Sequence, residues 1–349
     1  MALVSESRPE WLIADLAIMA AGAISVPTYV TNSSRDHEHI LENSGAQGAI
    51  VSTSKLSKAL LPAAHESDAC QFVIAMEAPK ISQSLNLDIH LWDNVMLASQ
   101  GKVEEVAETV KGISRDDTAC LIYTSGTGGA PKGVMISHGA ILHNCAGARD
   151  VILELGIKDE AFLSFLPLSH AYEHTGGQFF PISIGAQIYY AEGIDRLAQN
   201  MEEAKPTIMT VVPRLFELLR NRVVKSVEDQ GGISLKLFNR AVEIGQKRVS
   251  DPGSLNWREK IMDKMLERLV RRKVQARFGG RIKALVSGGA PLNPDVGLFF
   301  HALGLRLLQG YGQTESGPVV SCNTPNSCKM HTVGPMLKDT EVKIAEDGE

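Results

Sequence analysis

Residues 119–133, ACLIYTSGTGGAPKG, change from apolar to small and polar side chains at a single point. The run ACLIY is typical of a buried strand, because five residues in a row carry no charge. The glycines that follow let a backbone turn its N–H groups toward an anion. The stretch therefore predicts a strand that ends in a phosphate-binding loop, within an α/β fold.

Side chains in and after this loop support the same interpretation. The hydroxyl groups of the loop supply further hydrogen-bond donors, and Lys132 supplies a full positive charge. Ser137 is suited to cap a helix that we predict from Gly139 to Leu153. We therefore expect a strand, a loop and a helix in direct succession, which is an arrangement that binds phosphate groups.

The stretch does not match either of two well-known glycine-rich motifs that bind nucleotides. A Walker A loop needs glycine where Pro131 stands and serine or threonine where Gly133 stands. The dinucleotide-binding pattern needs its third glycine at Pro131 as well. Taken alone, the stretch is also consistent with an ordinary surface loop, so its interpretation depends on the rest of the chain.

The composition is that of an ordinary globular protein. The 349 residues are 44% hydrophobic and 21% charged, and the net charge of −5 gives no indication of nucleic acid binding. The five cysteines form no CxxC pair, which favours a reducing compartment, so we expect a cytoplasmic protein. The longest apolar stretch, residues 16–30, is too short to span a bilayer and contains Pro27.

Strand and helix patterns alternate along most of the chain, which predicts α/β architecture with largely parallel sheets. The expected strands are Ile24–Tyr29, Gln47–Val51, Gln71–Ala75, Ala119–Tyr123, Gln187–Tyr190, Thr207–Val211 and Ile282–Ser287. The expected helices are Pro9–Ala23, Ser137–Leu153, Pro213–Glu228, Leu235–Arg248 and Trp257–Phe278.

The charged segment Val103–Asp117 is predicted to be a surface connection. It divides the chain into a first α/β subdomain, residues 1–117, and an ATP- and acyl-binding region, residues 118–349. The first residues indicate a strand that runs straight into a helix, and the last ten, TEVKIAEDGE, indicate a strand that stops at its turn. We therefore expect the chain to be a piece of a longer protein.

Two further stretches repeat the change from strand to glycine. They are LVSGGAPLN, residues 285–293, and LLQGYGQTES, residues 307–316. The glycines on both sides of Tyr311 would leave its ring open to a flat partner such as adenine. The hydroxyl of Thr314 suits a phosphate, and the carboxylate of Glu315 suits Mg²⁺, which prefers oxygen ligands. Three such stretches predict one cleft at the carboxyl ends of parallel strands.

The motifs YTSGTGGAPKG, LPLSHAYEH, SGGAPL and GYGQTE resemble those of the adenylate-forming (AMP-dependent) acyl-CoA synthetases. The likeness extends over essentially the whole chain and is strongest to the long-chain fatty-acid–CoA ligases. It implies the large N-terminal domain of that fold, with mixed and parallel sheets flanked by helices. On this likeness we expect the sequence to end before the family's small C-terminal domain, and Gly128 stands where the family usually has a second threonine.

The resemblance implies a ligase that activates a fatty acid with ATP to an acyl-adenylate and transfers the acyl group to coenzyme A. The implied partners are these small molecules and Mg²⁺, without nucleic acid. The implied catalytic residues are Lys132, His170, Thr314 and Glu315, and the implied metal ligands are Thr124 and Glu315. The implied nucleotide-binding residues are Thr124, Ser125, Gly126, Thr127, Gly128, Gly129, Lys132, Gly288, Gly289, Ala290, Gln309, Gly310, Tyr311, Gly312 and Thr314.

Two alternatives remain open from the sequence. His170, Glu173 and His174 satisfy the pattern H-x-x-E-H, which on a helix would place two histidines on one face as zinc ligands of a hydrolase. The nearby Pro167 and the glycine pair after His174 leave little room for such a helix. The other alternative is a nucleotide-binding remnant without catalytic activity.

A basic segment suggests peripheral contact with a membrane. Its seven cations lie within sixteen residues that contain no acid, and anionic lipid attracts such clusters. They are Arg268, Arg271, Arg272, Lys273, Arg277, Arg281 and Lys283.

Overall fold

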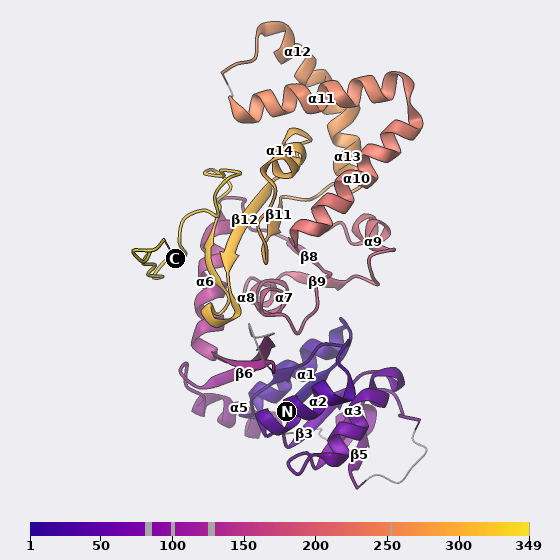
Figure 1. The fold of residues 1–349 in the computed structure, drawn as a ribbon, viewed down its shortest axis with the longest axis vertical. Helices are drawn as coiled ribbons and strands as arrows, with labels where there is room; N and C mark the ends of the chain where they lie inside the picture. Colours follow the sequence, from indigo (N-terminus) through magenta and orange to yellow (C-terminus); the bar gives the residue numbers. More distant parts are fainter. Residues whose placement is uncertain (81–85, 99–101, 125–129, 252, 349) are drawn as a thin grey trace. The chain divides into compact units, whose positions relative to one another are not determined.

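The computed structural model describes residues 1–80, 86–98, 102–124, 130–251 and 253–348 (Figure 1). The chain forms two compact units. The first contains Met1–His143 and Pro167–His174, and the second contains Asn144–Leu166 and Thr175–Glu349. The domain division after Asp117 stays a prediction.

The first unit is built on a parallel five-stranded sheet with the order β2-β1-β3-β4-β5. Its central strands are apolar and buried throughout, as expected where helices cover both faces of a parallel sheet. The strands are β1 (Ala2–Val4), β2 (Val26–Pro27), β3 (Gly48–Val51), β4 (Phe72–Ala75) and β5 (Asp88–Leu91).

Five helices accompany this sheet in the described part of the first unit. They are α1 (Pro9–Ala20), α2 (Ser34–Ser44), α3 (Ser54–Glu66), α4 (Trp92–Ala98) and α5 (Val103–Gly112). The helix α5 corrects the prediction of a surface connection at residues 103–117. Val103, Val106 and Val110 recur at the spacing of one helical face, which is the signal that the prediction overlooked in favour of the many charges. None of the helix's residues is buried.

The glycine-rich stretch lies in an antiparallel hairpin. Strand β6 (Thr118–Thr124) pairs with β7 (Lys132–Ser137), and only then does helix α6 (His138–Leu153) begin. The predicted order of strand, loop and helix is therefore wrong, because a second strand stands between the loop and the helix. The predicted cap is present in part, since the Ser137 hydroxyl accepts a hydrogen bond from the Ala140 amide at 3.1 Å.

The second unit contains a six-stranded sheet with the order β13-β12-β11-β10-β8-β9. Only β13 runs antiparallel to its neighbour, so the carboxyl ends of the other five strands share one edge. The strands are β8 (Ala161–Ser164), β9 (Gln187–Tyr190), β10 (Ile208–Val211), β11 (Ala284–Ser287), β12 (Leu307–Gly312) and β13 (Val319–Cys322). Figure 1 shows β11 and β12 side by side.

The described helical segments beyond α6 are one continuous run of three and a larger set in the second unit. The run is α7 (Ala171–Glu173), η1 (His174–Phe179) and α8 (Phe180–Ser183). The set is α9 (Leu197–Ala204), α10 (Pro213–Gln230), α11 (Gly232–Ser250), α12 (Trp257–Leu266), η2 (Glu267–Arg271), α13 (Arg272–Ala276), α14 (Pro294–Ala302) and η3 (Thr314–Ser316).

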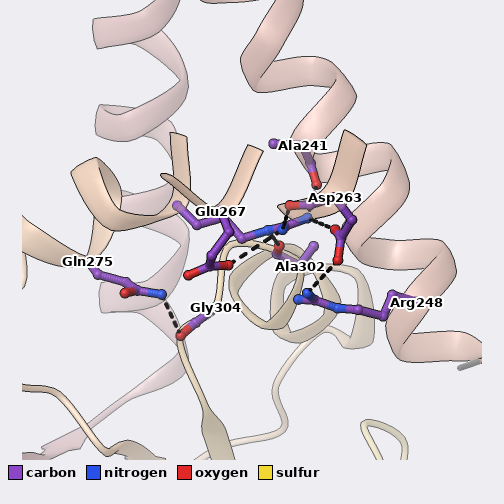
Figure 2. A network of polar contacts seen from close by, with 8 residues as sticks. Ala241, Arg248, Asp263, Glu267, Gln275, Ala302 and Gly304 are labelled. Atoms are coloured by element: carbon purple, nitrogen blue, oxygen red, sulfur yellow. Dashed lines mark hydrogen bonds and ion pairs between the residues drawn. The ribbon is translucent and has the colours of Figure 1, made fainter. Parts of the chain in front are cut away.

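A buried arginine joins four of these segments. The side chain of Arg271 is fully buried and donates hydrogen bonds to the carbonyl oxygens of Ala302, Asp263 and Ala241. It also forms an ion pair with Asp263, whose second carboxylate oxygen accepts from Arg248 (Figure 2). This network links α11, α12, η2 and the end of α14. An apolar side chain in place of Arg271 would leave these buried backbone carbonyls without hydrogen-bond donors.

The strand expected at the end of the chain is not present. Residues 340–348 contain no helix or strand, and most of their side chains are exposed. The alternation of apolar and charged residues in TEVKIAED has no neighbouring strand to pair with, and an unpaired strand pattern is not stable alone.

Candidate functional site

Two of the three predicted glycine stretches meet in the second unit. Gly288, Gly289 and Ala290 follow β11, and the GYG sequence ends β12, the next strand in the sheet. Gly289 and Ala290 line a pocket of about 450 Å³ together with the GYG sequence, whereas Gly288 is not among its lining residues. The predicted cleft is therefore confirmed for these two stretches, at the carboxyl ends of adjacent parallel strands.

Tyr311 lines this pocket with a ring that is 53% exposed. Its neighbours are glycines for a reason that the sequence did not reveal. The backbone of β13 passes so close that a Cβ atom on Gly312 would collide with the Pro318 carbonyl oxygen. A Cβ on Gly310 would lie 3.2 Å from the Ser321 carbonyl oxygen. The glycines therefore permit close strand pairing and leave the tyrosine as the exposed large side chain between them.

Another wall of the pocket comes from residues 330–333, which were not predicted from the sequence. Gln309 is buried and donates to the Met330 carbonyl oxygen at 2.7 Å. Asn323 is also buried and donates to the Thr332 carbonyl oxygen at 2.7 Å. Gln309 lines the pocket and also holds its far wall in place. No local pattern marks the wall, because it contains neither glycine nor a charged pair.

Thr314 and Glu315 lie in the short helix η3, directly after β12. The Ser316 hydroxyl accepts from the Gln313 amide at 3.1 Å and donates to the Pro318 carbonyl oxygen at 2.7 Å, which fixes this turn. The Glu315 side chain is exposed and takes part in no ion pair within the described ranges. Its carboxylate is therefore available to a cation.

The first glycine stretch belongs to the first unit, and Ser125, Gly126, Thr127, Gly128 and Gly129 lie outside the described residues. The two ends of the loop are described. Thr124 and Lys132 are opposite partners in the ladder between β6 and β7. The side chain of Lys132 is exposed. The hairpin thus places a hydroxyl and a cation at the two stems of the same turn.

Helix α2 holds both stems of this hairpin. The Tyr123 hydroxyl donates to Asn43 Oδ1 at 2.7 Å, and the Nε2 atom of His39 is 2.9 Å from the Pro131 carbonyl oxygen. A carbonyl oxygen only accepts, so His39 donates. His39 and Asn43 are four residues apart and share one face of the helix. Sequence reasoning missed both residues, because their spacing carries no information about a partner 80 or more residues away.

His170 caps the short helix α7, where its Nδ1 atom accepts from the Tyr172 amide at 3.2 Å. Its segment, residues 167–174, belongs to the first unit, although the residues on both sides belong to the second. At the end of this segment, His174 Nε2 donates to Asp15 Oδ2 at 3.0 Å, and both side chains are buried. Ser25 donates to the other oxygen of Asp15 at 2.5 Å. This pair fixes the segment to α1.

The H-x-x-E-H pattern does not form the face that a zinc site needs. His170 stands before the first turn of α7 with its Nδ1 on a backbone amide, and His174 Nε2 is committed to Asp15. Within the ranges that the structure describes, no three His, Cys, Asp or Glu side chains form a group that could hold a metal.

The sequence matches the AMP-binding enzyme family over residues 1–349. The chain belongs to this family. Among curated relatives, this chain is 30% identical over 354 residues to the long-chain-fatty-acid–CoA ligase FadD15 of Mycobacterium bovis, covering 99% of this chain and 56% of the relative. It is 28% identical over 349 residues to long chain acyl-CoA synthetase 3 of Arabidopsis thaliana, covering 97% of this chain and 51% of the relative.

A solved structure shows the same fold. It is the long-chain-fatty-acid-CoA ligase FadD1 of Archaeoglobus fulgidus, with a TM-score of 0.65 and 20% identity over 99% of this chain and 59% of that chain. The chain thus spans a little more than half the length of these relatives. The predicted family and the α/β fold with mixed and parallel sheets are confirmed.

The structure corrects the composition of the basic segment, residues 268–283. Arg271 is fully buried, so it cannot contribute to a surface charge. Lys283 forms an ion pair with Glu160, and Arg281 donates to the Asp159 carbonyl oxygen at 3.0 Å. Separately, no helix in the described ranges combines the length and the apolar character needed to cross a membrane.

Proposed function

We propose that this chain carries the nucleotide- and acyl-binding part of an AMP-forming ligase for long-chain fatty acids. In the first step a carboxylate oxygen attacks the α-phosphorus of ATP, and the bond to the bridging oxygen of pyrophosphate breaks. In the second step the sulfur of coenzyme A attacks the acyl carbon, AMP leaves, and the thiol proton passes to solvent. Family membership and the names of the curated relatives support this reaction.

The exposed ring of Tyr311 is the observation that carries the nucleotide site. We assign it to stacking on adenine, since the exposed side chain lines the pocket and an aromatic ring stacks favourably on another flat ring. Gly289, Ala290 and residues 309–312 line the same pocket, and we assign their backbone to the surroundings of the base. Gln309 holds the Met330 carbonyl oxygen at the opposite wall of the pocket. Gly310 and Gly312 carry no side chain that could cover the Tyr311 ring.

The loop from Thr124 to Gly129, together with Lys132, is assigned to the β- and γ-phosphates. Thr124 and Lys132 stand opposite each other at the base of the hairpin, so a cation and a hydroxyl flank the turn. Preorganised donors of this kind stabilise charge that develops on the phosphates during transfer. His39 and Asn43 act on the loop indirectly, since they hold its stems.

Thr314 is assigned to the α-phosphate, and Glu315 with Thr124 to Mg²⁺. The donor set fits this ion, because an exposed carboxylate and a hydroxyl are oxygen ligands. Bound Mg²⁺ would neutralise phosphate charge as pyrophosphate leaves. His170 is assigned to the acyl end of the site, where the Asp15–His174 pair keeps its segment in one position.

We also propose a cellular compartment for the protein and a peripheral contact with membranes. All five cysteines are free, in agreement with a reducing compartment such as the cytoplasm. The exposed cations of the basic segment support peripheral contact with anionic lipid, now without Arg271.

Pyrophosphate release tests the proposed reaction. ATP and Mg²⁺ would be supplied with palmitate, and in a control with benzoate, to this chain and to a version extended at both ends. We expect palmitate-dependent release by the extended version and far less by the chain alone. ATP binding without pyrophosphate release in either version would identify a nucleotide-binding protein without ligase activity, and would overturn the proposal.

A further inference from the structure

A second pocket of the second unit lies among helices α10, α11, η2 and α13. Its volume is about 220 Å³, and it shares no lining residue with the pocket at Tyr311. The lining residues from α10 are 10 to 17 positions beyond Pro213, where that helix leaves the sheet edge. At 1.5 Å per residue they lie about 15 to 25 Å along the helix from the edge. The pocket is therefore separate from the proposed nucleotide site.

The pocket has an apolar side and a polar side, and Gln230 and Ser234 belong to the polar side. Val223, Phe238, Val270 and Val274 are buried side chains of the main core cluster, and Val227 and Leu237 pack against them at the wall. The volume is below the roughly 300 Å³ at which pockets for drug-sized ligands begin. A nucleotide does not fit it, whereas a run of methylene groups does.

The mouth of the pocket is cationic. Lys273 and Arg277 lie one helical turn apart, with exposed side chains, and both line the pocket. Arg277 donates to the Ser226 hydroxyl at 3.1 Å. Within the described ranges, neither cation has an acidic partner within 4.0 Å. Two cations without acids at the mouth of a pocket with an apolar side are complementary to an amphiphile with an anionic head.

We propose that this pocket binds the carboxylate form of a free fatty acid, with its hydrocarbon chain among the valines and its head group between Lys273 and Arg277. The site is distinct from the one at which the acid would be activated. The proposal depends only on the residues that line this pocket. If it is wrong, the proposed ligase reaction is unaffected.

The test uses decanoate as the probe and methyl NMR of the valines as the readout. The wild-type chain should show shifts of the Val223 and Val274 methyl signals that saturate with decanoate. Decanol, which has the same chain without the charge, should bind at least about tenfold more weakly, as should decanoate to Lys273→Gln/Arg277→Gln. The matched control is Arg268→Gln/Arg272→Gln, which removes two exposed cations from the same segment outside the pocket.

Two results would overturn the proposal. One is equal decanoate affinity in the two double variants. The other is an absence of shifts at the pocket valines while decanoate binds elsewhere. Anionic lipid headgroups of a membrane are the other ligand that the two cations could bind. Co-sedimentation with phosphatidylglycerol vesicles tests for this alternative. If both double variants lose vesicle binding equally and decanoate shifts no pocket methyl, the cations serve a membrane surface, and the pocket is not a fatty-acid site.

Discussion

Asp263 and Arg271 form a buried ion pair in which Oδ1 and Nη2 are 2.6 Å apart. The same carboxylate accepts from Arg248 Nη1 at 2.9 Å through its other oxygen. The guanidinium satisfies three backbone carbonyls in addition. A charge that is buried to this extent is tolerated because each of its donor groups meets an acceptor.

We expect Arg271→Met to destabilise the chain by about 3 to 5 kcal/mol, because it leaves carbonyl oxygens and the Asp263 carboxylate without their donor. Urea unfolding followed by tryptophan fluorescence would measure the change. The matched control is Arg272→Met, which removes the same group from the exposed neighbouring position and should change the free energy of unfolding little. Equal effects of the two substitutions would show that the buried network adds nothing.

Tyr311→Ala should weaken AMP binding to this chain. Removal of aromatic stacking on a base costs about 1 to 3 kcal/mol in single-stranded nucleic acid sites. Calorimetric titration with AMP measures the loss, and Tyr189→Ala on β9 is the control, since that ring is also exposed but does not line the pocket. Unchanged affinity in Tyr311→Ala would remove this residue from the nucleotide site.

Loosening the hairpin stems should affect ATP and AMP differently. The double variant His39→Ala/Tyr123→Phe removes the His39–Pro131 and Tyr123–Asn43 hydrogen bonds, each worth about 0.5 to 1.5 kcal/mol. We expect weaker binding of ATP and unchanged binding of AMP, because only ATP has the β- and γ-phosphates. A loss of affinity for both nucleotides, with a lowered melting temperature, would instead indicate a general effect on folding.

Glu315→Gln keeps the shape of the side chain and removes its charge. In the version of the protein extended at both ends, palmitate-dependent pyrophosphate release should fall sharply and recover only in part at high Mg²⁺ concentration. Glu341→Gln, which alters an exposed carboxylate near the end of the described chain, is the control. Wild-type rates and wild-type Mg²⁺ dependence in Glu315→Gln would show that this carboxylate is not a metal ligand.

The buried ring of His37 should make stability depend on pH. Burial lowers the pKa of His37 from 6.5 to about 4, so between these values the unfolded chain binds a proton that the folded chain does not. Stability is therefore greatest above pH 6.5 and falls as the pH drops toward 4, by up to about 3 kcal/mol from this residue.

Urea unfolding at several pH values between 4 and 7 tests this prediction. His37→Gln should flatten the dependence, whereas His90→Gln, which changes an exposed ring of the same unit, should not. The prediction fails if wild type and His37→Gln lose stability in parallel as the pH falls.

Much of the fold was predictable from local patterns. The apolar strands of both sheets and the long helices carry periodic signals that neighbouring residues produce by themselves. The strand and the glycines at residues 285–290 and 307–312 were sufficient to predict the pocket at Tyr311, since parallel strands bring their carboxyl ends to one edge. The motifs were also sufficient to identify the family.

Pairing between distant segments decided the rest. The hairpin of β6 and β7 replaces the predicted direct passage from loop to helix, because β7 is stabilised by its partner and not by its own sequence. Arg271 is buried within a run of cations, which composition alone cannot distinguish from a surface patch. The contacts of His39 and Asn43 with the glycine loop depend on chain segments about 80 to 90 residues away. The sequence determined which groups the site contains, and the tertiary structure decided which distant side chains hold them, because such contacts depend on long-range packing that leaves no periodic signal.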